Sequence, residues 1–193
     1  MGTCKVRNSD NVPAMQRIRL AQTLVLAASL VTTADGAASL VRSMDLAELT
    51  RSAEQIVVAD VLLVESAWDD SHRTIHSTID IAVAECWKGS PPGDGRMRIR
   101  QLGGTVGEIE MTVHGMPRFS VGERALLFLE HSRVVGMNQG KRQLQWNTEK
   151  KEWQVAAPDR SPGVVMVGPS GRWPTPPETL DSLRSRVRSL LSR

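Results

Sequence analysis

The stretch QIVVADVLLVES (residues 55–66) decides the fold, because it is rich in β-branched residues and apolar on both faces. Such a run is typical of a strand that is buried on both sides. The stretch TIHSTIDIAVAECW (residues 74–87) alternates instead, with Ile79 and Ile81 on one face and Asp80 on the other. A period of two indicates a half-buried strand. The two stretches, separated by a polar turn, predict the first strands of a mainly β domain.

Apolar or alternating segments continue along the chain and predict the remaining strands. They lie at residues 96–102, 108–113, 124–130 and 163–168, with a hairpin at residues 142–155. In that hairpin Trp146 and Trp153 are placed to pair across the two strands. The number of short strands indicates a mainly β protein and favours a barrel.

Two helices are expected at the ends of this β-rich region. Residues 43–53 have the pattern of a short amphipathic helix that Ser43 caps. Residues 176–192 carry a leucine stripe beside several arginines, and Thr175 with Glu178 has the spacing of a capping box. The sequence therefore predicts a C-terminal amphipathic helix.

The glycines of GGTVG (residues 103–107) raise the question of a phosphate-binding loop. Such loops work because a helix begins directly after them and directs its N–H groups at the phosphate. The residues after Gly107 alternate with a period of two, so a strand follows instead. These glycines are therefore expected to turn the chain where a positive φ is required.

The first 38 residues have the pattern of a signal peptide. Arg17 and Arg19 precede the uncharged apolar run LAQTLVLAASLVTTA (residues 20–34), which is shorter than a membrane-spanning helix. Small residues follow, and cleavage after Ala38 or after Ala34 fits them. Met15 is an alternative start of translation. We therefore expect an exported protein, periplasmic or extracellular, whose mature form comprises residues 39–193 and has no transmembrane span.

Charge and cysteine content narrow the function further. Of the 24 basic and 21 acidic residues, four and two lie in the first 38, which leaves 20 basic and 19 acidic residues in the mature part. This balance argues against nucleic acid as the partner, because such proteins carry a basic excess. Cys86 is the sole cysteine of the mature part, so an internal disulfide is excluded and a hydrophobic core must supply stability.

The residues that could carry chemistry are dispersed. His72 and His76 have helical metal-ligand spacing, but on a strand they would lie about 13 Å apart, too far for one ion. Ser170 in GPSG lacks the spacing of a nucleophile elbow. No cofactor and no metal are expected. A hydrolase that uses His114, His131 and Glu123 remains the alternative to a binding protein.

The aromatic residues suggest where a partner would bind. The chain has five tryptophans, no tyrosine and two phenylalanines, and Trp68 and Trp87 fall near strand ends. Aromatic side chains at a rim favour contact with a protein, peptide or sugar. With His114 and Glu123 in the nearby connections, they form the candidate partner-binding set.

A family resemblance rests on SAEQIVVADVLLVE, IAVAECWKG and GERALLFLE, which span residues 46–130 with their surroundings. Their order is similar to that of the netrin-like modules related to tissue inhibitors of metalloproteinases, and the chain also resembles small exported bacterial proteins of undefined role. The resemblance implies a five-stranded OB-type barrel. Those inhibitors begin with a zinc-chelating cysteine and carry many disulfides, both of which this chain lacks, so no functional residue is transferred.

The sequence therefore predicts an OB-like five-stranded Greek-key barrel with an extra hairpin, a short N-terminal helix and a C-terminal amphipathic helix. The expected function is a non-catalytic interaction module whose partner is an exported protein or an envelope polymer.

Overall fold

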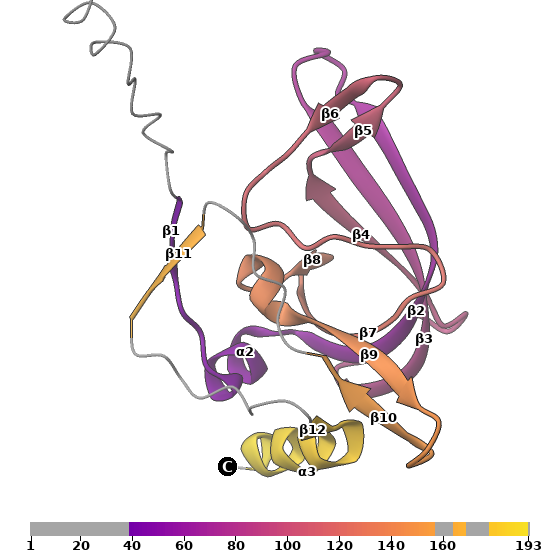
Figure 1. The fold of residues 1–193 in the computed structure, drawn as a ribbon, viewed down its shortest axis with the longest axis vertical. Coiled ribbons are helices and arrows are strands. Elements are labelled where there is room, and N and C mark those ends of the chain that lie inside the picture. Colours follow the sequence, from indigo (N-terminus) through magenta and orange to yellow (C-terminus); the bar gives the residue numbers. More distant parts are fainter. Residues whose placement is uncertain (1–38, 157–163, 169–177, 193) are drawn as a thin grey trace, which may run out of the picture. The chain divides into compact units, whose positions relative to one another are not determined.

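The computed structural model describes residues 39–156, 164–168 and 178–192, and all of them belong to one compact unit, Ala37–Arg193. The predicted signal peptide, Ser170 and the predicted cap at Thr175 lie outside the described residues. The described chain is mainly β, with a short helix before the large sheet and a second helix at the end (Figure 1), as predicted. Neither helix is long and apolar enough to cross a membrane.

One long antiparallel sheet organises the molecule. Its strands, in spatial order, are β12 (Glu178–Thr179), β10 (Glu152–Val155), β9 (Lys141–Asn147), β7 (Arg124–Glu130), β2 (Gln55–Trp68), β3 (Ile75–Lys88) and β4 (Arg96–Leu102), with β8 (Arg133–Val134) paired to β7. Three consecutive strands, β2 to β4, form a meander, and β7 returns to pair with β2. This order is that of a Greek key, which confirms that part of the prediction.

The sheet is not closed into a barrel, and in this respect the structure differs from the predicted OB-like barrel. The free edge of β4 approaches the β7–β8 turn, where Arg100 N donates to Ser132 O at 3.1 Å. β8 is two residues long, and the chain between β6 (Ile109–Met111) and β7 contains Pro117 and forms no strand. Because proline lacks an N–H, this segment is poorly suited to complete the ladder.

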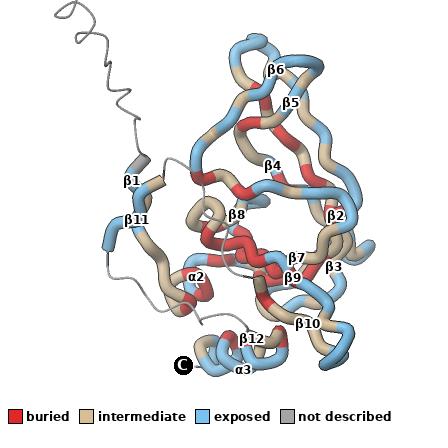
Figure 2. The backbone as a smooth tube through the Cα atoms, viewed as in Figure 1, coloured by how far each residue is buried: buried red, intermediate tan, exposed pale blue. Residues whose placement is uncertain are grey.

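The two faces of the sheet carry two separate cores. On the outer face, α2 (Leu46–Ser52) and α3 (Leu180–Leu191) pack their leucines against β2, β7 and β9. The inner face curls around a second cluster that includes Ile79, Ile81 and Ile99, each fully buried, which we call the apolar layer. Figure 2 shows the buried residues concentrated where β2, β7 and β9 meet, while the end near β5 (Gly104–Val106) and β6 is more exposed.

Both predicted helices exist, but their starts differ from the prediction. Asp45, not Ser43, caps α2: its Oδ1 accepts from Glu48 N at 2.7 Å, and the Glu48 side chain completes a capping box. α3 begins at Leu180 rather than at residue 176, and Thr179 caps it by accepting from Ser182 N. Each true cap is a short polar residue that has an extended backbone and stands directly before the helix.

Two two-stranded ribbons, β5–β6 and one near the N-terminal end of the described chain, lie outside the large sheet. In the β9–β10 hairpin Trp146 lies opposite Trp153 with ring centroids 5.3 Å apart, which confirms the predicted pair. The predicted last strand is β11 (Val164–Val167), which pairs in parallel with β1 (Ser39–Arg42). A 3-10 turn, Met137–Gly140, precedes β9.

Candidate functional site

A cleft of about 510 Å³ lies at the open end of the curled sheet. The ends of β2, β3 and β4, the β5–β6 hairpin (Gly104–Val106 and Ile109–Met111) and the connection that leads to β7 surround it. Its lining residues are Val64, Ser66, Ser77, Gln101, Leu102, Gly103, Gly104, Thr105, Glu110, Met111, Thr112, Val113, Met116, Pro117, Arg118, Phe119 and Ser120. The lining has one acid and one base, so the cleft has no net formal charge.

Gly103 and Gly104 line one corner of the cleft, and Gly107 lies at the tip of the β5–β6 hairpin. Gly103 and Gly104 have φ of +95° and +141°, and Gly107 has φ of +61° at the turn between β5 and β6. A side chain at Gly104 would also clash with the hydroxyl groups of Ser66 and Ser77, over which its backbone passes. The prediction that these glycines turn the chain is confirmed, and Gly104 additionally permits a close approach.

Small polar side chains replace the apolar layer at the cleft. Ser66 and Ser77 lie opposite each other on β2 and β3, and Gln101 follows Ile99 on the inner face of β4. We call these three residues the polar layer. Ser77 Oγ donates to Gly103 O at 2.6 Å, so the proton between the two hydroxyls, whose oxygens are 3.0 Å apart, comes from Ser66. The lone pairs of Ser66 Oγ therefore remain available as acceptors.

Residues 116–121, which we call the strap, cross the opening between β4 and β9. From the β4 side, Gln101 Nε2 donates to Pro117 O at 3.0 Å; from the β9 side, Lys141 Nζ donates to Arg118 O at 2.5 Å. The Phe119 ring packs against the inner core, with Lys141 Nζ 4.8 Å from its centroid. Two side chains and one aromatic ring thus hold the strap across the gap.

Glu123, a predicted partner-binding residue, lies just beyond the strap and is buried. Its side chain is 8% exposed, and Oε1 lies 2.7 Å from Nζ of Lys141, whose side chain is 6% exposed. The contact is an ion pair without hydrogen-bond geometry, since Glu123 Oε1 accepts no hydrogen bond. Glu123 therefore contacts Lys141, a residue that the sequence did not point to, and little of its side chain is exposed.

The other predicted residues do not meet at one rim. Trp68, at the end of β2, shares the strand face of Val64 and Ser66 and stacks on His72 with centroids 6.4 Å apart. His114 is exposed in the connection just before the strap. These two flank the cleft. Trp87 lies at the opposite end of the β2–β3 hairpin, next to Lys88, which pairs with Ile56.

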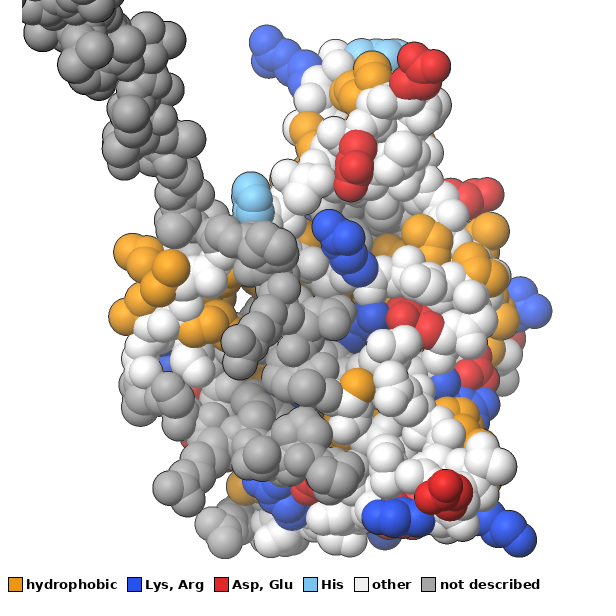
Figure 3. Space-filling model, viewed as in Figure 1, with side chains coloured by type: hydrophobic (Ala, Val, Ile, Leu, Met, Phe, Trp, Pro, Cys, Tyr) orange, Lys and Arg blue, Asp and Glu red, His pale blue; other side chains and the backbone are white. Residues whose placement is uncertain are grey.

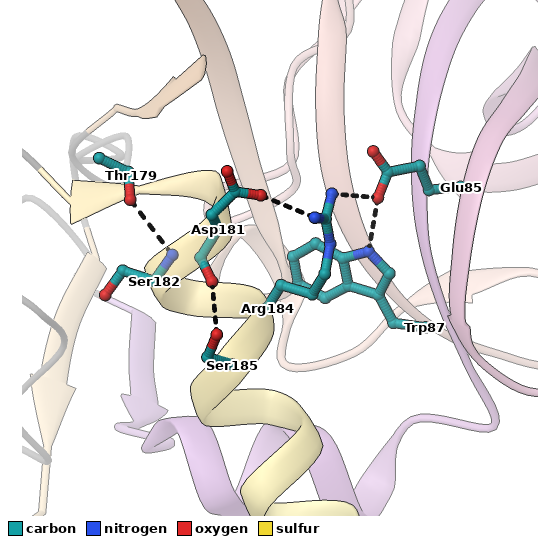
Figure 4. A network of polar contacts seen from close by, with 7 residues as sticks. All are labelled: Glu85, Trp87, Thr179, Asp181, Ser182, Arg184 and Ser185. Carbon is teal, nitrogen blue, oxygen red and sulfur yellow. Dashed lines mark hydrogen bonds and ion pairs between the residues drawn. The ribbon is translucent and has the colours of Figure 1, made fainter. Parts of the chain in front are cut away.

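Trp87 is part of a network that holds α3 against the sheet (Figure 4). Its Nε1 donates to Glu85 Oε2 at 3.0 Å, and Arg184 of α3 donates to the same oxygen at 2.5 Å. The guanidinium carbon lies 5.6 Å from the Trp87 ring centroid, and Arg184 also binds Asp181 at 2.7 Å. Burial opposes the ionisation of Glu85, but the two hydrogen bonds outweigh it, so the pKa of this carboxyl is lowered. The network positions a helix.

The four histidines lie at four separate places. His72 stacks on Trp68, His76 Nε2 is 3.2 Å from the hydroxyl of Thr74, and His131 Nε2 is 3.3 Å from Glu54 in an exposed pair. Thr74–His76 is the one hydroxyl–imidazole contact that the described residues show. Within the same residues no three His, Cys, Asp or Glu side chains form a group that could hold a metal ion.

The surface charges are mixed. Figure 3 shows basic and acidic side chains interspersed over the face in view, and hydrophobic side chains gathered on the β1–β11 ribbon. Arg98 pairs with Asp80 at 2.6 Å, and Arg124 binds Asp60 through two bonds of 2.7 Å. These two arginines of the sheet thus already have carboxylate partners.

Comparison with known proteins finds no matching family model, no matching curated protein and no matching solved structure. The resemblance to netrin-like modules therefore stays a prediction.

Proposed function

We propose that the protein is a non-catalytic interaction module that binds a segment of another protein in the cleft. The observation that supports this proposal is the lining itself. A concavity of about 510 Å³ falls within the usual size of binding sites, which is roughly 300–1,000 Å³. Its walls combine apolar side chains with hydroxyl and amide groups, and its two charged residues, Glu110 and Arg118, have opposite signs.

Two features of the lining favour a polypeptide as the ligand. Met111 and Met116 stand among the apolar residues, and methionine adapts its shape to different apolar side chains. The polar layer supplies acceptors for the N–H groups that an extended backbone presents. Trp68 continues the same strand face beyond the cleft and would extend the contact area.

We further propose that the partner is an exported protein. The apolar run of residues 20–34, with arginines before it and small residues after it, supports export. Cell fractionation followed by N-terminal sequencing of the mature chain tests this part. A mature chain in the cytoplasm that retains residues 20–34 would refute it.

The test of binding compares two Thr→Arg variants that differ only in the position of the substitution. Thr105 lines the cleft and Thr148 lies in the β9–β10 turn, and both are exposed. We expect tagged wild-type protein to capture one stoichiometric partner from the exported fraction. Thr105→Arg should lose that partner at least tenfold, whereas Thr148→Arg should keep it.

Equal capture by both variants would show that the partner binds elsewhere, and capture of no protein by the wild type would refute the proposal. Capture of an envelope polymer that Thr105→Arg loses would keep the cleft but replace the ligand class.

A further inference from the structure

The strap is bounded by the last backbone hydrogen bonds on each side of it. Gly115 O accepts from Asn138 N at 2.8 Å, and Gly122 N donates to Val61 O at 2.9 Å. Between these two points, the backbone–backbone bonds of the described chain are local turns, Met116 N to Val113 O and Glu123 N to Ser120 O. No ladder therefore joins the strap to β4 or to β9.

The closed strap leaves one side-chain acceptor buried without a hydrogen bond. Gln101 donates from Nε2 to Pro117 O, and because a carbonyl can only accept, the other atom of the Gln101 amide must be the oxygen. This Oε1 is buried and accepts no hydrogen bond. Water would satisfy it if the strap moved out, so the closed state carries the cost of one unsatisfied acceptor.

Both ends of the strap have glycine with positive φ. Gly115 has φ of +87° and Gly122 has φ of +84°, and a Cβ at Gly122 would meet nothing within 4 Å. The interior of the strap is stiffened by Pro117, whose ring fixes its own φ. A stiff segment between two permissive residues can rotate as one piece, because large dihedral changes concentrate at such hinges.

We propose that the strap is a gate that rotates about Gly115 and Gly122, and that a partner segment opens it by placing an aromatic side chain where the Phe119 ring now lies. This inference rests on the proposed function, because the partner is the segment that binds the cleft. Phe119 lines the cleft, packs on the inner core and lies beneath the Lys141 ammonium, so it occupies a site suited to an aromatic ring. The closed strap is then an internal competitor of the partner.

Lys141 reports on the gate without any partner. Its side chain is 6% exposed, and its ammonium is bound to Arg118 O and paired with Glu123, so it should be modified only when the strap opens. The measurement is the rate of acetylation of Lys141 by an N-hydroxysuccinimide ester, followed by mass spectrometry. Exposed Lys150 serves as the reference, and amide hydrogen exchange of β7 reports global unfolding.

Two glycine variants of the full chain test the hinge. Gly122→Ala strains the closed conformation without a steric clash, so Lys141 should be acetylated about five- to thirty-fold faster than in the wild type. Gly95→Ala is the matched control, since Gly95 also has positive φ and open space but lies in the turn before β4, outside the lining of the cleft. It should leave the rate at Lys141 unchanged.

The gate would be overturned if Lys141 were acetylated only at the rate of global unfolding. It would also be overturned if the acetylation rate of Lys141 rose equally in both variants.

Coupling to a ligand is tested with a random peptide library displayed on phage and selected on Gly122→Ala. We expect selected peptides to share an aromatic residue and to bind Gly122→Ala more tightly than the wild type, by no more than the factor by which opening rises. Binding to Gly95→Ala should equal binding to the wild type.

The possible results separate the two proposals. Gate opening without any cleft-binding peptide would refute the proposed function and leave the gate in place. Peptides that bind the cleft equally in wild type and Gly122→Ala, although opening differs, would overturn the competition between strap and partner and leave the proposed function in place.

Discussion

The inner face of the sheet has two regions built on the same strands. The apolar layer of Ile79, Ile81 and Ile99 is fully buried, whereas two residues further along β3 and β4 stand Ser77 and Gln101 of the polar layer. Strand pairing continues without interruption between β3 and β4 through both regions. The backbone is thus the same, and only the side chains change.

One end of the sheet therefore stabilises the fold, and the other end leaves space that a ligand can enter. Burial of large apolar side chains dominates folding free energy, and the apolar layer supplies it. Small hydroxyl side chains such as Ser66 and Ser77 cannot fill the same volume, so the other end of the curl stays open as the cleft. Substitutions in the two layers should therefore have different consequences.

The largest loss in the free energy of unfolding is expected for a substitution where the strap meets the inner core. Lys141→Met removes the partner of a buried carboxylate, and uncompensated charges of this kind cost about 3–5 kcal/mol. Urea unfolding of wild type and variant measures the loss. The double variant Lys141→Met/Glu123→Gln should recover part of it, because no unpaired charge remains. A single variant as stable as the wild type would show that Glu123 finds water in the folded protein.

A direct comparison of the two layers comes next. Ile79→Ala should lower the free energy of unfolding by about 2–5 kcal/mol, because it leaves a cavity at a fully buried position. Ser77→Ala, two residues away, should cost about 1 kcal/mol through the lost hydrogen bond to Gly103 O. Equal losses in thermal or urea unfolding would contradict the division into layers.

The smallest effect on stability is expected on the outer face, away from the cleft and both layers of the inner face. The hydrogen bonds from Arg124 lower the pKa of Asp60 below its ordinary 3.8, although partial burial opposes them. A lowered pKa means that the bound carboxylate stabilises the fold above pH 3.8, and that this contribution disappears as the pH falls through the folded pKa. Between pH 5 and 2, Asp60→Asn should therefore lose less stability than the wild type in urea unfolding. Parallel curves would contradict the assignment.

Much of the fold could be predicted from the sequence, because alternation and β-branched runs report strands directly. The segments at residues 96–102 and 124–130 have the predicted bounds. Closure of the barrel could not be predicted, since it depends on whether β4 finds a partner strand far along the chain. The helix caps were misplaced because several short polar residues precede each helix, and only one of them adopts the capping geometry.

The cleft was only partly predictable. The glycines at residues 103–107 pointed to a turn, and Trp68 lies beside the cleft. Lys141 gave no signal, because a lysine at the start of a strand usually faces solvent. Its inward direction follows from its register opposite Leu127, which becomes visible only once β7 and β9 are paired. The role of Gln101 was not predicted either, because its contact with Pro117 of the strap appears only in the folded chain.

The outer core also fixes the order in which the chain can fold. Leu49 near one end of the described chain and Leu183 near the other belong to one buried cluster. Loop closure over so long a separation is slow, and partly made chains cannot bury Leu49 against its final neighbours. The native state is therefore reached only after the last helix has been synthesised. A nascent or truncated chain that lacks residues 180–191 would leave the leucines of α2 exposed, so the last helix completes the outer core.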